Sequence, residues 1–172
     1  MKSFAPFFVL LLLTSISQNI EASNPITPRE SIDMIWDNGK KGEKTFLKHA
    51  DACLAKIEAA AKELDISGSA MIAFIPGDQA QTWVSKMKVM GRLSNEKANY
   101  LGIACTKVSE MAVTLKDSGN QDRASIKGEF GYQGGVIRKV AGGYLVGAFS
   151  GASGEQDAQV SAVGLDWLMQ QF

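Results

Sequence analysis

Apolar residues recur every three or four positions in three parts of the chain, the spacing expected of amphipathic helices. The first part spans residues 45–64. The second begins after Ser94, which we expect to cap a helix that carries Glu96 in its first turn, at the positive end of the helix dipole. The third opens at Ser153, because Ser153 and Gln156 match a capping box, and runs to the C-terminus. The pattern therefore predicts three helices.

Shorter apolar or alternating runs between these helices predict strands. Residues 69–75 (SAMIAFI) form an apolar run that a Pro-Gly-Asp turn signal ends, and residues 82–88 alternate with a period of two, so the two segments predict a hairpin. A polar loop over 116–123 precedes two more strand-like pieces, around 130–137 and 143–149. Hairpins set between helices, without strict alternation of strand and helix, are typical of the α+β class. We expect an antiparallel sheet flanked by helices.

The beginning of the chain has the pattern of a secretory signal peptide. Lys2 supplies a positive charge, residues 7–13 (FFVLLLL) are uninterruptedly apolar, and a polar stretch leads to Ala22. The apolar run is far shorter than the roughly 20 residues that cross a bilayer, so a retained membrane anchor is the less favoured alternative. We expect a signal peptide over 1–22 and an exported protein, periplasmic in a Gram-negative source and otherwise extracellular.

A segment with little periodicity separates the signal from the first long helix. Residues 29–37 could form a helical turn or two before Gly39 and Gly42, which we expect to break the helix. We therefore interpret residues 23–44 as an N-terminal extension, available for contact with a partner, and residues 45–172 as one domain. The length of the chain allows one compact domain and leaves little room for two.

Composition and charge exclude several classes of function. The chain carries 18 Lys and Arg against 18 Asp and Glu, its pI is near 6.6, and no basic cluster stands out. A nucleic acid is therefore not an expected partner, because binding to phosphates requires a basic surface. With 45% hydrophobic and 21% charged residues, the chain has the composition of a folded protein.

Two cysteines, Cys53 and Cys105, lie in the first and second helical patterns. An exported protein meets oxidising conditions, so a disulfide between them is one prediction, and two small buried thiols are the other. A bridge requires their Cα atoms to approach within about 7 Å. The C-x-x-C-H motif of covalent haem attachment is absent, and so is the clustered Cys and His spacing of a structural zinc site.

Nine of the 17 glycines fall between Gly128 and Gly154. Most are expected at turns and strand ends, where a positive φ or close backbone approach favours glycine. A phosphate-binding loop before the last helix is the alternative, but no nucleotide-binding glycine motif occurs, and Glu155 and Asp157 would repel an anion there.

These glycines belong to a string that resembles the GlcG/HbpS family of haem-binding proteins, also known as DUF336. The string runs from Gly-Gly-Val-Ile-Arg through Gly-Gly-Tyr-Leu-Val-Gly-Ala to Ser-Gly-Ala-Ser-Gly-Glu-Gln-Asp, the most specific part. The order of the preceding helix and hairpin also resembles the family, so the similarity covers about residues 45–172. The motif residues are Gly134, Gly135, Gly142, Gly143, Ser150, Gly151, Gly154, Glu155, Gln156 and Asp157.

The resemblance implies a fold and a function. It implies an α+β domain in a profilin-like arrangement, with helices on both faces of the sheet, often assembled into homo-oligomers. Exported members bind haem non-covalently for sensing or sequestration, which is the function we expect. The alternatives are a module that binds a small organic acid or a corrinoid-related ligand, and an accessory protein that binds a partner without catalysis.

Haem binding would need an iron ligand, and His49 is the chain's one imidazole. His49 lies at the edge of the apolar stripe of the first helix, so it is the candidate axial ligand, with an exposed surface histidine as the alternative. Tyr100 and Tyr132 are further candidate ligand residues, and Lys97 and Arg138 could pair with haem propionates.

An enzyme is the other class of function. A nucleophilic Ser150 or Ser153 would depend on the distant His49, and the G-x-S-x-G motif is absent. Glu155 and Asp157 lie two positions apart on a helix, so their side chains point in different directions, and favourable charge at the helix N-terminus explains both. We therefore expect no catalytic residues.

Overall fold

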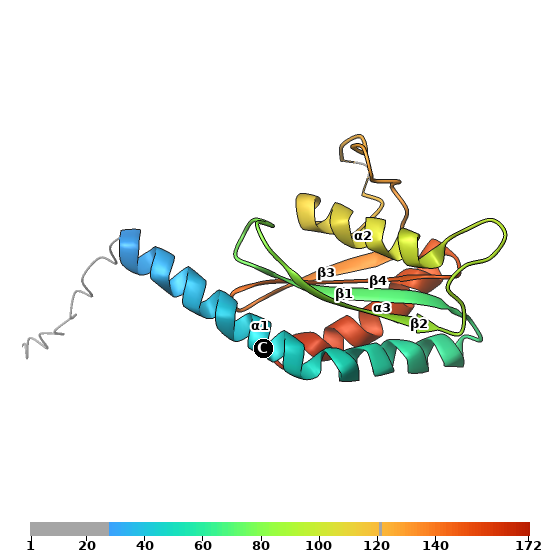
Figure 1. Cartoon of the computed structure of the whole chain (residues 1–172), viewed down its shortest axis with the longest axis horizontal. Coiled ribbons are helices and arrows are strands. Elements are labelled where there is room, and N and C mark those ends of the chain that lie inside the picture. The colour runs from blue at the N-terminus through green and yellow to red at the C-terminus, as the bar shows by residue number, and fades with distance from the viewer. Residues whose placement is uncertain (1–27, 121) are drawn as a thin grey trace, which may run out of the picture.

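The computed structural model describes the backbone of residues 28–120 and 122–172 and the side chains of residues 37–120 and 122–172. The predicted signal peptide, 1–22, lies outside the described residues, as does the start of the predicted extension. Three helices and four strands follow one another along the chain (Figure 1). They are α1 (Pro28–Glu63), β1 (Gly68–Pro76), β2 (Val84–Met90), α2 (Tyr100–Thr114), β3 (Gly135–Val140), β4 (Gly143–Ser150) and α3 (Gly154–Met169).

The four strands form one antiparallel sheet in the order β2-β1-β4-β3. The predicted hairpin is present, because β1 pairs with β2 along its length. Eight of the nine residues of β1 are buried, which explains the apolar run of the sequence, since a central strand covered on both faces has no polar side. The α+β class predicted from the sequence is thus confirmed.

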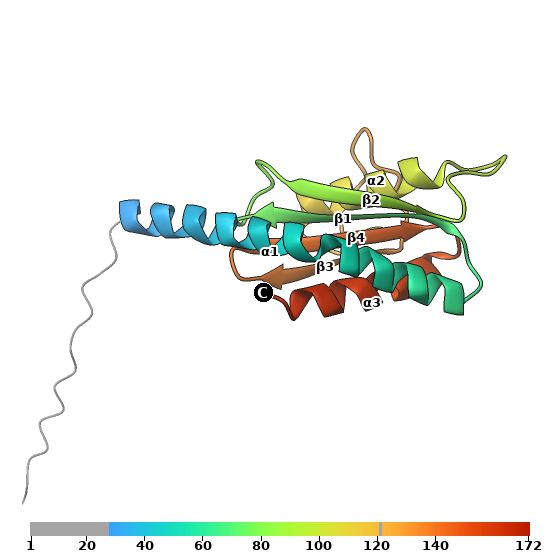
Figure 2. The same cartoon turned by 60° about the horizontal axis from the view of Figure 1, so that its bottom comes forward.

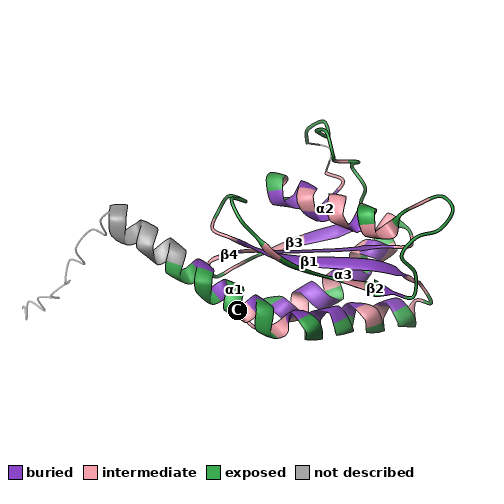
Figure 3. Cartoon of the chain, viewed as in Figure 1, coloured by how far each residue is buried: buried purple, intermediate pink, exposed green. Residues whose placement is uncertain are grey.

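Helices cover both faces of the sheet, as expected. Helices α1 and α3 pack on one face around Phe46, Phe74 and Phe149, and α2 packs on the other face around Val108 and Met111 (Figure 2). The buried positions follow the inner side of each helix (Figure 3). The two faces therefore have separate apolar cores, divided by the sheet. The profilin-like arrangement implied by the resemblance stays a prediction.

The predicted break at Gly39 and Gly42 is wrong, because α1 runs continuously from Pro28 to Glu63. A Cβ atom on Gly42 would overlap the ring of Phe74, and one on Gly39 would lie 3.2 Å from the Cβ of Pro76. These glycines let the helix approach the end of β1 closely. Part of the predicted extension is therefore the first half of a helix that packs on the sheet.

The start of α2 also differs from the prediction. Asn99 caps the helix, because its side-chain oxygen accepts a hydrogen bond from the Gly102 N–H at 2.9 Å. Ser94 and Glu96 instead lie in the preceding turn, where the Asn95 side chain accepts hydrogen bonds from two backbone N–H groups. An asparagine side chain that satisfies backbone donors in this way favours a turn over a helix.

In the second half of the chain, one predicted strand begins later than expected and one predicted helix cap is present. The strand expected around 130–137 begins only at Gly135, because Gly131 and Gly134 have φ of 65° and 117° and hold the chain in a loop. The capping box of Ser153 and Gln156 is confirmed, and α3 follows it.

Two glycines inside helices, one closely packed and one not, allow the effect of packing on stability to be separated from that of helix propensity. A Cβ on Gly164 of α3 would overlap Ile57 of α1, whereas one on Gly102 of α2 meets only ordinary contacts of 3.6 Å or more. Gly164→Ala should lower the free energy of unfolding by about 1–3 kcal/mol through overpacking. Gly102→Ala, the matched control, should raise it by up to about 1 kcal/mol. Urea denaturation measures both, and a stabilised Gly164→Ala would contradict the packing.

Candidate functional site

Four of the motif residues, Ser150, Gly151, Gly154 and Asp157, line one cavity of about 610 Å³. It lies between the first half of α2, the loop before β3, and the segment from the end of β4 to the start of α3. We call it the α2–α3 cavity. Its lining residues are Ala98, Tyr100, Ile103, Lys107, Gly131, Tyr132, Gln133, Ser150, Gly151, Ala152, Gly154 and Asp157.

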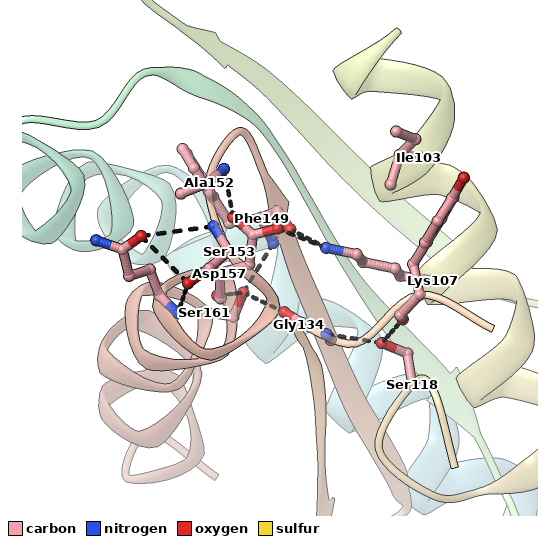
Figure 4. A network of polar contacts seen from close by, with 12 residues as sticks. Ile103, Lys107, Ser118, Gly134, Phe149, Ala152, Ser153, Asp157 and Ser161 are labelled. Atoms are coloured by element: carbon pink, nitrogen blue, oxygen red, sulfur yellow. Dashed lines mark hydrogen bonds and ion pairs between the residues drawn. The ribbon is translucent and has the colours of Figure 1, made fainter. Parts of the chain in front are cut away.

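An ion pair between Lys107 and Asp157 forms one wall of the cavity. The Lys107 Nζ lies 2.7 Å from Asp157 Oδ2, and the two side chains are only 2% and 3% exposed. Nζ also donates to the Phe149 carbonyl at 2.9 Å, and Asp157 Oδ1 accepts from the Ala152 N–H at 3.0 Å (Figure 4). The pair thus connects α2, the end of β4 and the start of α3, three elements far apart in the sequence.

The environment of the pair shifts both titrations towards the neutral forms. Burial lowers the pKa of Lys107 and raises the pKa of Asp157, and the opposite charge of the partner counteracts each shift. Neither charge would be stable at this depth alone. Each residue is therefore needed to keep the other one ionised.

Gly134 makes room for this pair. A Cβ atom at this position would lie 2.7 Å from Lys107 Nζ and close to Asp157 Cβ, and its φ of 117° also disfavours other residues. The Ser161 hydroxyl lies 3.0 Å from the Gly134 carbonyl and accepts from the Phe149 N–H at 2.7 Å. The motif glycine is explained by the ion pair that packs against it.

Several hydrogen-bond donors at the cavity remain free. The ammonium of Lys107 has three N–H groups, and two of them are used. Ser150 is 3% exposed and lies on the α2 side of the sheet. Its hydroxyl has no hydrogen-bond partner among the described residues, and because no fully buried side-chain N or O atom there lacks a partner, this hydroxyl is open to the cavity. The N–H groups of Gly154 and Glu155 in the first turn of α3 also have no acceptor among the residues that the structure describes. Both carboxylate oxygens of Asp157 already accept hydrogen bonds, Oδ2 from Lys107 and Oδ1 from the Ala152 N–H.

Two phenols lie at the same cavity. Tyr100 accepts a hydrogen bond from the Asn95 side chain, and Tyr132, whose own carbonyl accepts from the Ser118 hydroxyl at 2.8 Å, packs its ring against Phe130. Glu155 is exposed and does not line the cavity. The charges of Lys107 and Asp157 offset each other, and the N-termini of α2 and α3 add positive partial charge, which the Glu155 carboxylate in the first turn of α3 opposes.

The other predicted ligand residues lie elsewhere. His49 is on α1, where its ring packs edge-on against Trp167 of α3 with the centroids 6.0 Å apart. This is the opposite face of the sheet from α2 (Figure 1). Arg138 on β3 pairs with Asp166 at 2.7 Å. The structure brings Tyr100 and Tyr132 together but leaves His49 and Arg138 apart from them.

Lys97 and the second pair of motif glycines are also outside the cavity. Lys97 is exposed in the turn before α2, next to Ala98, which lines the cavity. Gly142 and Gly143 form the turn between β3 and β4, where the Gly142 carbonyl accepts from the Gly77 N–H at 2.9 Å. Their role is to join the two hairpins at the other end of β4 from Ser150.

Sequence reasoning missed Lys107 entirely and assigned Asp157 to favourable charge at the helix end. The corrected role of Asp157 is that of a buried ion-pair partner. One signal was available, because Lys107 lies between Ala104, Val108 and Met111, inside the apolar stripe of its helix. A lysine on a buried helix face needs an acidic partner.

The structure contains no disulfide, and both cysteines are free thiols. Cys53 on α1 is buried, and Cys105 on α2 is partly exposed on the other face of the sheet. Desolvation raises the pKa of Cys53 to about 12 and raises that of Cys105 as well. Of the two predictions, the structure therefore bears out two free thiols, because the sheet separates Cys53 from Cys105.

No group of three or more His, Cys, Asp and Glu side chains within the described residues could hold a metal ion. In the same part of the chain, no helix combines the length and apolarity needed to cross a bilayer.

The comparisons with known proteins add no relative. No protein-family model, no curated protein and no solved structure matches the chain. Membership in the GlcG/HbpS family therefore stays a prediction that rests on the residues of the motif.

The two thiols should differ in reactivity. Below pH 9, Cys53 remains almost wholly protonated because its pKa is near 12, and its sulfur is shielded, so alkylation at pH 8 should modify Cys105 alone in the native protein. Both should react after unfolding in urea without a reductant. Mass spectrometry counts the adducts, and a chain that takes up none when unfolded would carry the disulfide that the structure lacks.

The ion pair should behave as one unit in a double-mutant cycle. Lys107→Met or Asp157→Asn leaves one buried charge without its partner and should cost about 3–5 kcal/mol of unfolding free energy. The double variant removes both charges, and its asparagine oxygen can still accept from Ala152. It should therefore lose less than the sum of the single variants in urea denaturation. Additive losses would contradict the coupling.

Proposed function

We propose that this protein is a binding module that holds a small organic acid in the α2–α3 cavity without transforming it. The observation that carries the proposal is the hydroxyl of Ser150, which has no partner among the described residues and is open to the cavity that the partly free ammonium of Lys107 also lines. A carboxylate supplies the acceptors that these donors lack.

The volume of the cavity and the donors around it favour a small anion as the ligand. A volume of about 610 Å³ lies within the range of roughly 300–1,000 Å³ that small-molecule sites usually have. The free N–H groups at the start of α3 add donors at the positive end of a helix, a common setting for carboxylates and phosphates. The predicted repulsion by Glu155 and Asp157 is reduced at Asp157, because Lys107 neutralises that charge, whereas no ion-pair partner of Glu155 is present among the described residues.

The same contacts argue against catalysis in the cavity. Lys107 is held as a charged donor by Asp157 and by the Phe149 carbonyl, so it is not a free base for Ser150. The imidazole of His49 lies on the other face of the sheet and cannot activate Ser150. Binding without reaction is therefore the better supported function.

Haem remains a second candidate, and the two phenols at the cavity favour it there. Tyr100 and Tyr132 both line the cavity, and a tyrosine oxygen can hold haem iron. The residues fit haem less well at His49, because Arg138, an expected propionate partner, is already paired with Asp166, and Lys97 is exposed in the turn before α2. A haem in this protein would depend on the tyrosines. The corrinoid-related ligand and the partner-binding accessory role have no specific support.

Location and assembly follow from the sequence and the resemblance. We infer that the protein is exported, periplasmic in a Gram-negative source, and that it forms homo-oligomers. Both inferences are independent of the ligand.

Isothermal titration with glycolate and related small acids tests the leading proposal. We expect saturable binding that weakens about tenfold in Ser150→Ala, the effect of one hydrogen bond to a charged group. Ser109→Ala is the matched control, because this serine of α2 bonds only to its own helix and does not line the cavity. Equal affinities of the wild type and Ser150→Ala, or no binding of any acid, would refute the site.

Haemin is titrated against the same variants. If haem is the ligand, a saturable Soret change should weaken in Tyr132→Phe and persist in His49→Ala. Loss of the signal in His49→Ala alone would place haem on the other face and contradict this reading of the cavity.

A further inference from the structure

The two edge strands of the sheet, β3 and β2, differ in whether other residues hydrogen-bond to their outer backbone groups. The outer edge of β3 is covered, because Ile137 donates its N–H to Asp117 at 2.9 Å and Gly135 accepts from the Ser118 N–H at 3.1 Å. The outer edge of β2 has no such partner within the described residues, where β2 pairs only with β1. An uncovered edge strand is a template for a further strand.

Apolar side chains lie along this open edge. On the α2 side of the sheet, β2 presents Met87 and Val89, which are 38% and 43% exposed because α2 packs over β1 and β4 and not over β2. Trp83, directly before the strand, and Leu93, three residues after its end, are exposed as well. We call these four residues the β2 stripe. An apolar stripe of this kind beside free backbone groups is unfavourable in water.

The other side of β2 carries two lysines whose charges are already neutralised. Lys86 lies 2.6 Å from Asp51 and Lys88 lies 2.6 Å from Glu58, both acids coming from α1. Unpaired lysines on an edge strand prevent further pairing by repulsion. Here α1 removes most of that protection, so two such strands can approach each other.

We propose that the partner at this edge is a second copy of the same chain, joined by antiparallel pairing of β2 with β2. A two-fold axis makes identical strands antiparallel, and centring it on Met87 places Met87 against the partner's Met87. Lys86 then faces the partner's Lys88, and each of these lysines keeps its acidic partner on α1, Asp51 or Glu58, the latter shared with Lys62. The sheet continues across the interface with eight strands, and the β2 stripes of both chains share one apolar seam.

This arrangement leaves the α2–α3 cavity open. The open edge belongs to β2, whereas Ser150 and Asp157 lie at the end of β4 and the start of α3, two strands away. The interface therefore does not depend on the proposed ligand, and ligand binding and assembly can fail separately.

Light scattering after size exclusion tests the interface with two matched variants. The wild type should have at least twice the chain mass at micromolar concentration, and Met87→Glu, which sets two carboxylates opposite each other, should raise the dissociation constant at least about 100-fold. Val163→Glu is the control, because Val163 is similarly exposed (46%) but lies on α3. A cooperative thermal unfolding transition of the Met87→Glu monomer would show that it still folds.

A cross-link tests the register. In a Cys105→Ser background, Met87→Cys should form an inter-chain disulfide under mild oxidation, because directly opposed Cβ atoms lie about 4.5–5.5 Å apart. Val163→Cys should not. A monomeric wild type, an assembly that survives Met87→Glu, or an absent Met87→Cys cross-link would each overturn the proposal, the second by showing that another surface makes the contact.

Discussion

The buried ion pair of Lys107 and Asp157 is the interaction on which the rest of this structure depends. Two charges lie in the protein interior and are kept ionised by each other, by the Phe149 carbonyl and by the Ala152 N–H. Removing one partner leaves an uncompensated charge, so the pair fixes the position of α2 relative to the start of α3. It also explains why position 134 is glycine, since no side chain fits beside the pair.

The same pair creates the cavity and determines its chemistry. Because β3 begins only at Gly135, the last residues of β4 have no neighbouring strand on that side, and the Lys107 ammonium occupies the place instead. Asp157 balances the charge of Lys107. The groups at the site that still lack a hydrogen-bond partner are therefore donors: one N–H of Lys107, the Ser150 hydroxyl and the N–H groups in the first turn of α3. A site with unused donors and an occupied carboxylate is suited to binding an acid and poorly suited to abstracting a proton.

The sequence allowed prediction of the elements that depend only on residues close together in the chain. The helices, the first hairpin and the capping box of Ser153 each depend on a few neighbouring residues, and they are present. Gly39 and Gly42 were misassigned because glycine serves both to break a helix and to admit close packing, and only the position of Phe74 distinguishes the two uses. Lys107 and Asp157 are fifty positions apart, so no local pattern pairs them. His49 was selected because it is the one imidazole of the chain, and the residue type alone does not show which face of the sheet its helix covers.

The central claim is that the free donors of the α2–α3 cavity bind a small carboxylate. Amide NMR during a titration with glycolate and longer acids tests it most directly, because Gly154 and Glu155 lie at the start of α3, by the cavity, whereas the Trp167 indole packs against His49 near the other end of that helix. The account predicts saturable shifts at Gly154 and Glu155 with Trp167 unchanged. Shifts centred on Trp167, or none at the start of α3 with any acid, would contradict it.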